Sequence, residues 1–263
     1  VRIIPRLDIK GPNLVKGIHL EGLRALGNPE EFAKAYYLGG ADELIYQDVV
    51  ASLYERNSLL PFIKKVAENI FIPLTVGGGI RSLSDIYNAL RSGADKVTIN
   101  TAAIKNPNFL KEAVKDFGSS TIVIAIEAIK TDKGEYNCFT DNGREYTDID
   151  VFDWASKVED MGVGELIVTS IDREGTGKGF DLELISKIAS KVKIPVVAHG
   201  GAGNIAHIRE LIDNTDISGV AISSMLHYYL IKQVTISSEN IEQEGNFAFL
   251  KGERDSFAQE VYS

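Results

Sequence analysis

Short apolar runs rich in Val, Ile and Leu alternate along the chain with longer stretches in which apolar residues recur at helical spacing. The runs predict buried strands and the stretches predict amphipathic helices, eight of each. The predicted strands are 3–8, 43–49, 71–76, 95–100, 121–127, 165–170, 194–198 and 218–222. The predicted helices are 29–39, 57–69, 82–92, 107–117, 150–162, 181–192, 204–213 and 226–234. Repeated strand–helix units predict an α/β fold, either a closed (β/α)8 barrel or an open doubly wound sheet.

Internal repeats favour the barrel. Three short motifs recur at offsets of 122 or 123 residues: 43–45 with 165–167, 77–80 with 200–203, and 97–101 with 220–224. The strand that ends in Asp8 is matched, 119 residues later, by a strand that ends in Glu127. These repeats predict a single TIM barrel built from two (β/α)4 half-barrels. Strands one and five of such a barrel lie opposite each other, so Asp8 and Glu127 are expected to face across its mouth.

Two segments depart from the regular pattern. Residues 129–147 contain Asp-Lys-Gly and Asp-Asn-Gly turns, which predict a β-hairpin inserted after the fifth strand. Residues 235–263 are polar and are expected to form an extension of undefined role beyond a barrel domain at 1–234. The helix starts carry predicted caps, which are Asn28, Ser82 or Ser84, Asn106, Asp181 and Asn204.

Composition narrows the function classes. A chain of 263 residues that is 44% hydrophobic fits one large globular domain. Its net charge of −9 argues against binding to nucleic acid or to an anionic membrane surface. The single cysteine, Cys138, excludes a disulfide framework. The histidines are scattered and show no metal-ligand spacing, so no metal is expected, and no cofactor is expected either. With no apolar run of membrane-spanning length, the prediction is a soluble cytoplasmic protein.

Two matched sets of small and polar residues follow predicted strands. Gly77–Gly79 lets a phosphate approach backbone N–H groups, and Asn100 and Thr101 add side-chain donors. Gly200, Gly201, Ser223 and Ser224 repeat this arrangement half a barrel away. The matched copies predict a ligand with a phosphate at each end, although tight turns before helices remain the alternative for each loop.

A ligand of that shape would place its middle between Asp8 and Glu127. Two opposed carboxylates act as general base and general acid when their surroundings separate their pKa values. The alternative is that each carboxylate caps its own strand end. Lys16 is a candidate for orienting a carboxylate or binding substrate, or a solvated surface charge. His199 is either a ligand contact or a structural residue.

Four charged residues fall at strand starts, at the opposite end of the predicted barrel: Arg2, Glu43, Lys96 and Glu165. They either form an ion-paired ring across the barrel floor or act as separate solvated caps. The residues by themselves favour separate caps.

Several of these motifs together resemble the cyclase subunit of imidazole glycerol phosphate synthase, over about residues 1–230 and in the same order. The motifs are Ile3-Ile-Pro with Leu7-Asp8, Val15-Lys-Gly17, Thr75-Val-Gly-Gly-Gly-Ile80, Gly93-Ala-Asp-Lys96, Ile99-Asn-Thr-Ala-Ala103, Thr169-Ser-Ile-Asp-Arg173 and Gly200-Gly-Ala-Gly203. The resemblance implies a half-barrel duplication, a bisphosphate substrate, and ammonia supplied by a separate glutaminase subunit docked on the barrel floor. The implied reaction cleaves and cyclises phosphoribulosyl-formimino-aminoimidazole ribonucleotide in histidine biosynthesis.

The resemblance also implies residue roles. Asp8 is one catalytic carboxylate, while Gly79, Asn100 and Thr101 bind one phosphate. The other phosphate is bound by a second set, Gly175, Gly201, Ser223 and Ser224. In the family, the floor ring that Arg2, Glu43, Lys96 and Glu165 match gates an ammonia passage, which reverses the preference for solvated caps.

Four residues depart from the family pattern, and all are expected at the active face. Glu127 stands for the second catalytic aspartate, Glu174 for an aspartate near a phosphate, and Arg6 and His199 for small residues. In this the chain is similar to paralogues of the cyclase in bacterial surface-sugar pathways, where ammonia converts an N-acetyl group to an acetamidino group. Three hypotheses follow: the family cyclase, an ammonia conduit for a sugar amidotransferase, and a non-enzymatic scaffold that activates the glutaminase.

Overall fold

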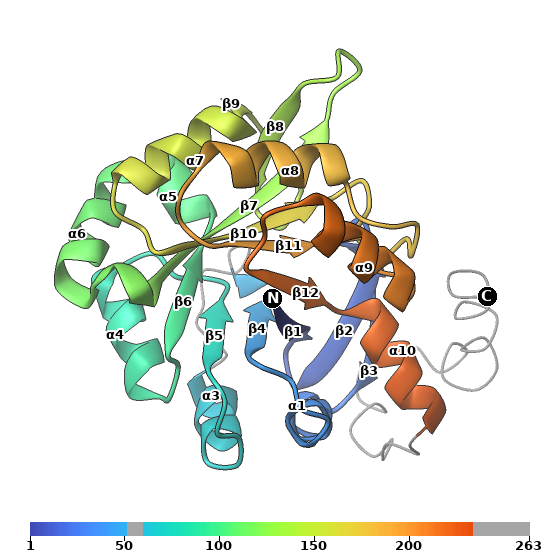
Figure 1. Cartoon of the computed structure of the whole chain (residues 1–263). Coiled ribbons are helices and arrows are strands. Elements are labelled where there is room, and N and C mark those ends of the chain that lie inside the picture. The colour runs from blue at the N-terminus through green and yellow to red at the C-terminus, as the bar shows by residue number, and fades with distance from the viewer. Residues whose placement is uncertain (52–59, 234–263) are drawn as a thin grey trace.

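The computed structural model describes residues 1–51 and 60–233, and eight parallel strands in this part of the chain close into a barrel (Figure 1). Each strand pairs with the next around the ring, which ends where β12 pairs with β1. The strands are β1 (Arg2–Lys10), β4 (Leu44–Asp48), β5 (Leu74–Gly77), β6 (Lys96–Ile99), β7 (Ile122–Lys130), β10 (Glu165–Ser170), β11 (Val196–His199) and β12 (Gly219–Ile222). The predicted (β/α)8 barrel is therefore confirmed. The open sheet is wrong, because parallel pairing also joins β7 to β10 and the ring has no edge.

Helices surround the barrel and pack their apolar faces on its outer surface. They are α1 (Pro29–Leu38), α3 (Leu60–Ala67), α4 (Leu83–Arg91), α5 (Thr101–Lys105), α6 (Pro107–Phe117), α7 (Val151–Asp160), α8 (Leu182–Lys191), α9 (Ile205–Asn214) and α10 (Ser224–Gln233), with a 3-10 turn at Ser119–Thr121. The short helix α5 was not predicted, because its five residues are too few to show a helical period. The predicted helix 57–69 begins outside the described residues, and the whole of the predicted extension at 235–263 lies outside them.

Most predicted helix caps are confirmed by a side-chain oxygen that accepts a backbone N–H. Asn28 accepts from Glu30, Asp181 from Leu184 and Asn204 from His207, and Ser82 forms a reciprocal capping box with Asp85. Asn106 is the exception. Its side chain makes no cap hydrogen bond to α6, and its backbone N–H ends α5 by bonding to the Ala102 carbonyl.

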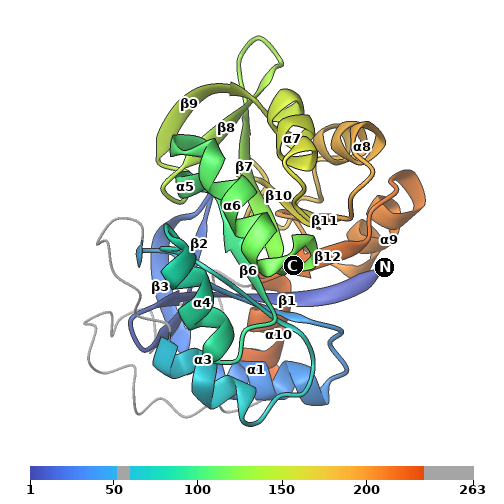
Figure 2. The ribbon, with the colours of Figure 1, turned by 90° about the vertical axis from the view of Figure 1, so that its left-hand side faces the viewer.

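Two antiparallel extensions are attached to the barrel at equivalent places. After β7, the strands β8 (Tyr136–Thr140) and β9 (Glu145–Asp150) confirm the predicted hairpin and extend it. After β1, the strands β2 (Asn13–Ile18) and β3 (Glu21–Gly27) form a second extension that was not predicted. Figure 2 shows β8 and β9 rising at the top and β2 and β3 at the left. Since each follows the first strand of a half-barrel, the extensions repeat the internal duplication.

The barrel interior is filled in layers, as the alternation of side chains along a strand requires. The central layer is an apolar cluster from six strands: Ile4, Ile45, Val123, Ile167, Val197 and Ala221. Charged residues lie below this layer at the strand starts, and polar residues lie above it at the strand ends. No helix among the described residues is long and apolar enough to cross a membrane.

The helix α1 provides a test of packing on the barrel. Phe32 is fully buried, and its ring lies edge-on to that of His227 with centroids 5.7 Å apart. We expect Phe32→Ala to lower the free energy of unfolding by about 3–5 kcal/mol, because it leaves a cavity in the core. Leu38, on the same helix, is 73% exposed, and Leu38→Ala should change this free energy by less than about 0.5 kcal/mol. Urea unfolding measures both, and equal losses would contradict this packing.

Candidate active site

The carboxyl ends of the parallel strands meet at one end of the barrel, which we call the mouth. Asp8 comes from β1 and Glu127 from β7, and these strands are separated by three others around the ring. The two carboxylates therefore lie on opposite sides of the mouth, as predicted. Both are buried.

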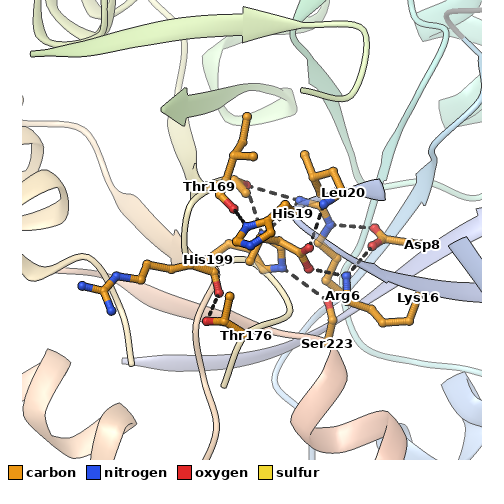
Figure 3. Close-up of polar contacts among 12 residues, drawn as sticks. Arg6, Asp8, Lys16, His19, Leu20, Thr169, Thr176, His199 and Ser223 are labelled. Carbon is orange, nitrogen blue, oxygen red and sulfur yellow. Dashed lines mark hydrogen bonds and ion pairs between the residues drawn. The ribbon is translucent and has the colours of Figure 1, made fainter. Parts of the chain in front are cut away.

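Asp8 is held by two cations (Figure 3). Arg6 Nε donates to Asp8 Oδ1 at 2.9 Å, and Lys16 Nζ donates to Asp8 Oδ2 at 3.4 Å. Lys16 also forms an ion pair with Glu174. Lys16 reaches this position because β2 folds back antiparallel on β1, with Val15 opposite Asp8. Lys16 is thus a buried member of the mouth, and the solvated-charge alternative is wrong.

The pKa of Asp8 reflects this pairing. Burial by itself would raise it, because a charged carboxylate is poorly solvated in a protein interior. The nearby charges of Arg6 and Lys16 outweigh burial and hold the pKa of Asp8 well below its ordinary value. Asp8 is consequently a permanent anion at neutral pH.

Glu127 has the opposite environment. Burial raises its pKa to about 7, although Arg6 lowers it and the Gly143 N–H donates to Oε2 at 2.8 Å. Gly143 belongs to a tight turn between β8 and β9, in which Asp141, Asn142 and Gly143 all have positive φ. The Asp-Asn-Gly sequence predicted this turn, but it did not predict that the turn would support Glu127.

A cavity of about 220 Å³ opens beside Glu127, between β5, β6 and β7. We call it the first pocket. Its lining includes Gly79, Asn100 and Thr101, three residues predicted to bind a phosphate, together with Arg81 and Lys105. Asn100 Nδ2 donates to the Phe139 carbonyl at 3.1 Å, so the β8 strand helps to position it.

The second predicted phosphate site is also assembled, but it encloses little space. Glu174, Gly175, Gly201, Ser223 and Ser224 surround a cavity of about 10 Å³, which we call the second pocket. A volume of that size accommodates roughly one water molecule. The residues predicted for the site therefore lie together around a space much smaller than the first pocket.

The floor ring joins all four charged residues at the strand starts. Arg2 pairs with Glu43 and Glu165, and Lys96 pairs with both carboxylates at 3.0 Å. Thr75 Oγ1 adds a hydrogen bond to Glu43 at 2.5 Å. The residues by themselves had favoured separate solvated caps, and that interpretation is wrong. The converging strand starts bring the four side chains within reach of one another.

The sequence left open the roles of two further residues of the mouth, Arg6 and His199. Arg6 is buried, and its Nη1 reaches Thr169 Oγ1 at 3.4 Å and His199 Nδ1 at 3.3 Å. His199 Nε2 lies 3.3 Å from Ser223 Oγ. The sequence signals were a charge inside an apolar run and a histidine at a strand end, but neither indicated the partner.

Comparisons with known proteins agree with this geometry. A model of a known family, described as histidine biosynthesis protein, matches residues 2–232, which include every residue of the mouth and the floor ring. The chain is similar to the imidazole glycerol phosphate synthase subunit HisF of Legionella pneumophila, with 60% identity over 205 residues, covering 78% of this chain and 97% of that protein. A protein of the same name from Bacillus cereus strain G9842 is 44% identical over 227 residues, covering 86% and 90%.

The raised pKa of Glu127 predicts how stability depends on pH. Between the ordinary pKa of 4.5 and about 7, the native protein holds a proton that the unfolded chain has released. The free energy of unfolding therefore falls as pH rises through this window. Glu127→Gln imitates the protonated carboxyl, so we expect it to match the wild type near pH 5 and to be more stable by about 2–3 kcal/mol near pH 8. Urea unfolding across this range provides the measurement, and parallel pH curves for the two proteins would show that the pKa is not raised.

Proposed function

The chain belongs to the HisF family of imidazole glycerol phosphate synthase subunits, and on this basis we propose that it is the cyclase of histidine biosynthesis, a lyase that uses ammonia from a glutaminase. The observation that carries the proposal is the opposed pair at the mouth, Asp8 and Glu127. One carboxylate is permanently ionised, and the other has a pKa near 7. Separated pKa values on two facing carboxylates suit general acid–base chemistry.

The substrate of this reaction is phosphoribulosyl-formimino-aminoimidazole ribonucleotide, which carries two phosphates. We infer that one phosphate binds in the first pocket at Gly79, Asn100 and Thr101, which places the reacting centre between the carboxylates. Ammonia must lose protons as it forms new bonds to carbon. Glu127 is suited to accept and return a proton because its pKa lies near neutral pH. Asp8 remains charged and stabilises positive charge that develops on the substrate.

The products would be imidazole glycerol phosphate and an aminoimidazole carboxamide ribotide.

The contacts of Lys16 support the assignment of Asp8, since Lys16 bridges the carboxylates of Asp8 and Glu174 inside the mouth. This bridge fixes the hairpin of β2 and β3 over the strand end.

We assign the glutaminase partner to the opposite end of the barrel. The floor ring supports this assignment, because Arg2, Glu43, Lys96 and Glu165 form a closed circuit of alternating charge around the barrel axis. Above the ring lies the apolar layer that contains Ile4 and Ile167. A neutral molecule such as ammonia crosses an apolar layer more readily than an ion does. The ring would then gate ammonia on its way to the mouth.

A second candidate is favoured by the side chains at the mouth. Arg6 and His199 fill space beside the second pocket, while the floor ring is complete. This combination supports a barrel that still receives ammonia but serves a different acceptor, as in the surface-sugar amidation pathway. A strain that lacks the gene would then lose the amidated sugar and still grow without histidine. A requirement for histidine would favour the cyclase.

The cyclase proposal is tested by turnover of the bisphosphate substrate with ammonium salt. We expect the wild type to act above background, and Asp8→Asn and Glu127→Gln each to reduce turnover by about 10²–10⁴-fold, because each removes one member of the pair. Asp153→Asn is the control, since this side chain is 82% exposed on α7. Absence of turnover by the wild type would reject the cyclase, and full turnover by both variants would reject the assigned residues.

The floor ring is tested in the complex with the glutaminase. We expect Arg2→Gln to reduce glutamine-dependent turnover by about fivefold or more, because the ring couples the two subunits. Turnover with added ammonium should stay near the wild-type rate, because free ammonia reaches the mouth from solvent. Lys65→Gln, which breaks an exposed ion pair with Glu30, should alter neither rate. Equal loss of both activities in Arg2→Gln would contradict a role in ammonia transfer.

A further inference from the structure

Strand register identifies which residues of the two half-barrels are equivalent. Ile45 on β4 pairs with Arg6 on β1, and its repeat counterpart Ile167 on β10 pairs with Ala125 on β7. Arg6 and Ala125 therefore occupy the same position in the two halves. Each lies two residues before its catalytic carboxylate and points into the barrel on the same side.

The same argument applies to the strands that follow. Gln47 on β4 pairs with Gly77 on β5, and Thr169 on β10 pairs with His199 on β11. Gly77 and His199 are therefore equivalent, as are Gln47 and Thr169. The strand register thus corrects the predicted match of 77–80 with 200–203, which is one residue out of register. The two pockets at the mouth are thus built on one plan. Ala125 lines the first pocket, and the equivalent position beside the second is Arg6; His199 lines the second pocket, and the equivalent position beside the first is Gly77.

This exchange of small for large side chains accounts for the unequal pockets. The first pocket measures about 220 Å³ and the second about 10 Å³. At Gly77, even a single added carbon would overlap the side chains of Thr98 and Gln47. The space beside the Gly77 Cα is thus already occupied, and no side chain from this position enters the first pocket, whereas the His199 imidazole lines the second pocket and Arg6 contacts it.

Arg6 and His199 are fixed in this position by a chain of polar contacts. Arg6 donates to Asp8 and to His199, and the other nitrogen of His199 lies within reach of Ser223, one of the predicted phosphate ligands. Burial and the neighbouring Arg6 hold the pKa of His199 well below its ordinary value, so the ring is neutral. With Nδ1 accepting from Arg6, Nε2 carries the proton and donates to Ser223.

The charges around the second pocket are also paired within the chain. Arg6 is matched by Asp8, and Lys16 is matched by Glu174, which lines the pocket. Glu174 Oε2 also accepts from the Leu20 N–H at 3.1 Å. An incoming phosphate would have to break buried ion pairs to use these cations, and breaking such a pair is costly.

We propose that Arg6 and His199 close the second pocket, so that the mouth anchors its ligand through a single phosphate, bound in the first pocket. The ligand class is therefore one with a phosphate ester at one end, and a bisphosphate would be held at one end only. The proposal rests on the phosphate site of the proposed function at Gly79, Asn100 and Thr101. It assigns Arg6 and His199 as the residues that determine specificity.

The test is a titration of the full chain with inorganic phosphate, followed by backbone amide chemical shifts at constant ionic strength. In the wild type we expect saturable shifts at Gly79 and Thr101 and none at Gly201 and Ser224. The double variant Arg6→Ala with His199→Gly gives the second pocket the small residues of the first. In this variant the Gly201 and Ser224 amides should also shift.

A matched control variant weakens phosphate binding in the first pocket instead. Asn100→Asp places a negative charge among the donors of the first pocket, and we expect it to weaken phosphate binding at Gly79 by about tenfold or more. The Gly201 and Ser224 amides should be unaffected. Loss of shifts in the first pocket alone identifies that pocket as the binding site.

Several outcomes would overturn the proposal. Shifts at Gly201 and Ser224 in the wild type, with the same dissociation constant as at Gly79, would show that the second pocket opens freely. A folded double variant without these shifts would show that Arg6 and His199 are not what closes it. If the double variant does not fold, the wild-type titration decides alone. The ammonium-dependent turnover assay reports on the cyclase separately, because it is positive or negative whichever pocket binds phosphate.

Discussion

Closure of the barrel is the constraint on which the other features of this protein depend. Parallel pairing of β12 with β1 and of β7 with β10 leaves no free edge. It also brings all strand starts to one end and all strand ends to the other. Charged residues far apart in sequence, such as Arg2 and Glu165, thereby become neighbours. The floor ring, the apolar layer and the mouth are consequences of this single geometry.

Burial gives the charged groups of the mouth their chemistry. In a medium of low polarity an unpaired charge is costly, so the ionisation of each carboxylate depends on its partners. Asp8 has Arg6 and Lys16 as close partners and stays ionised. Glu127 has a backbone N–H and a more distant guanidinium, and its pKa rises to about 7. Two similar side chains on opposite strands thus acquire different proton affinities.

The two half-barrels have kept their backbone plan and changed their side chains. Each begins with a long strand followed by an antiparallel extension, and each carries a carboxylate at the same strand position. The difference lies in the volume of the inward-facing residues near the strand ends. Ala125 lines the open pocket, whereas His199, which Arg6 contacts, lines the filled one. A duplicated scaffold can in this way provide one open pocket and one filled pocket.

The sequence by itself determined the barrel, its duplication and the opposed positions of Asp8 and Glu127, because strand periodicity and repeat offsets can be read along the chain without knowing which side chains touch. It also predicted the hairpin after β7 from its turn residues. Only the tertiary structure decided where long side chains reach. Arg6 contacts residues 163 and 193 positions away, and Lys16 reaches Asp8 through a hairpin that was not predicted. No local pattern encodes such contacts, since they depend on which strands surround the barrel interior and on how its volume is filled.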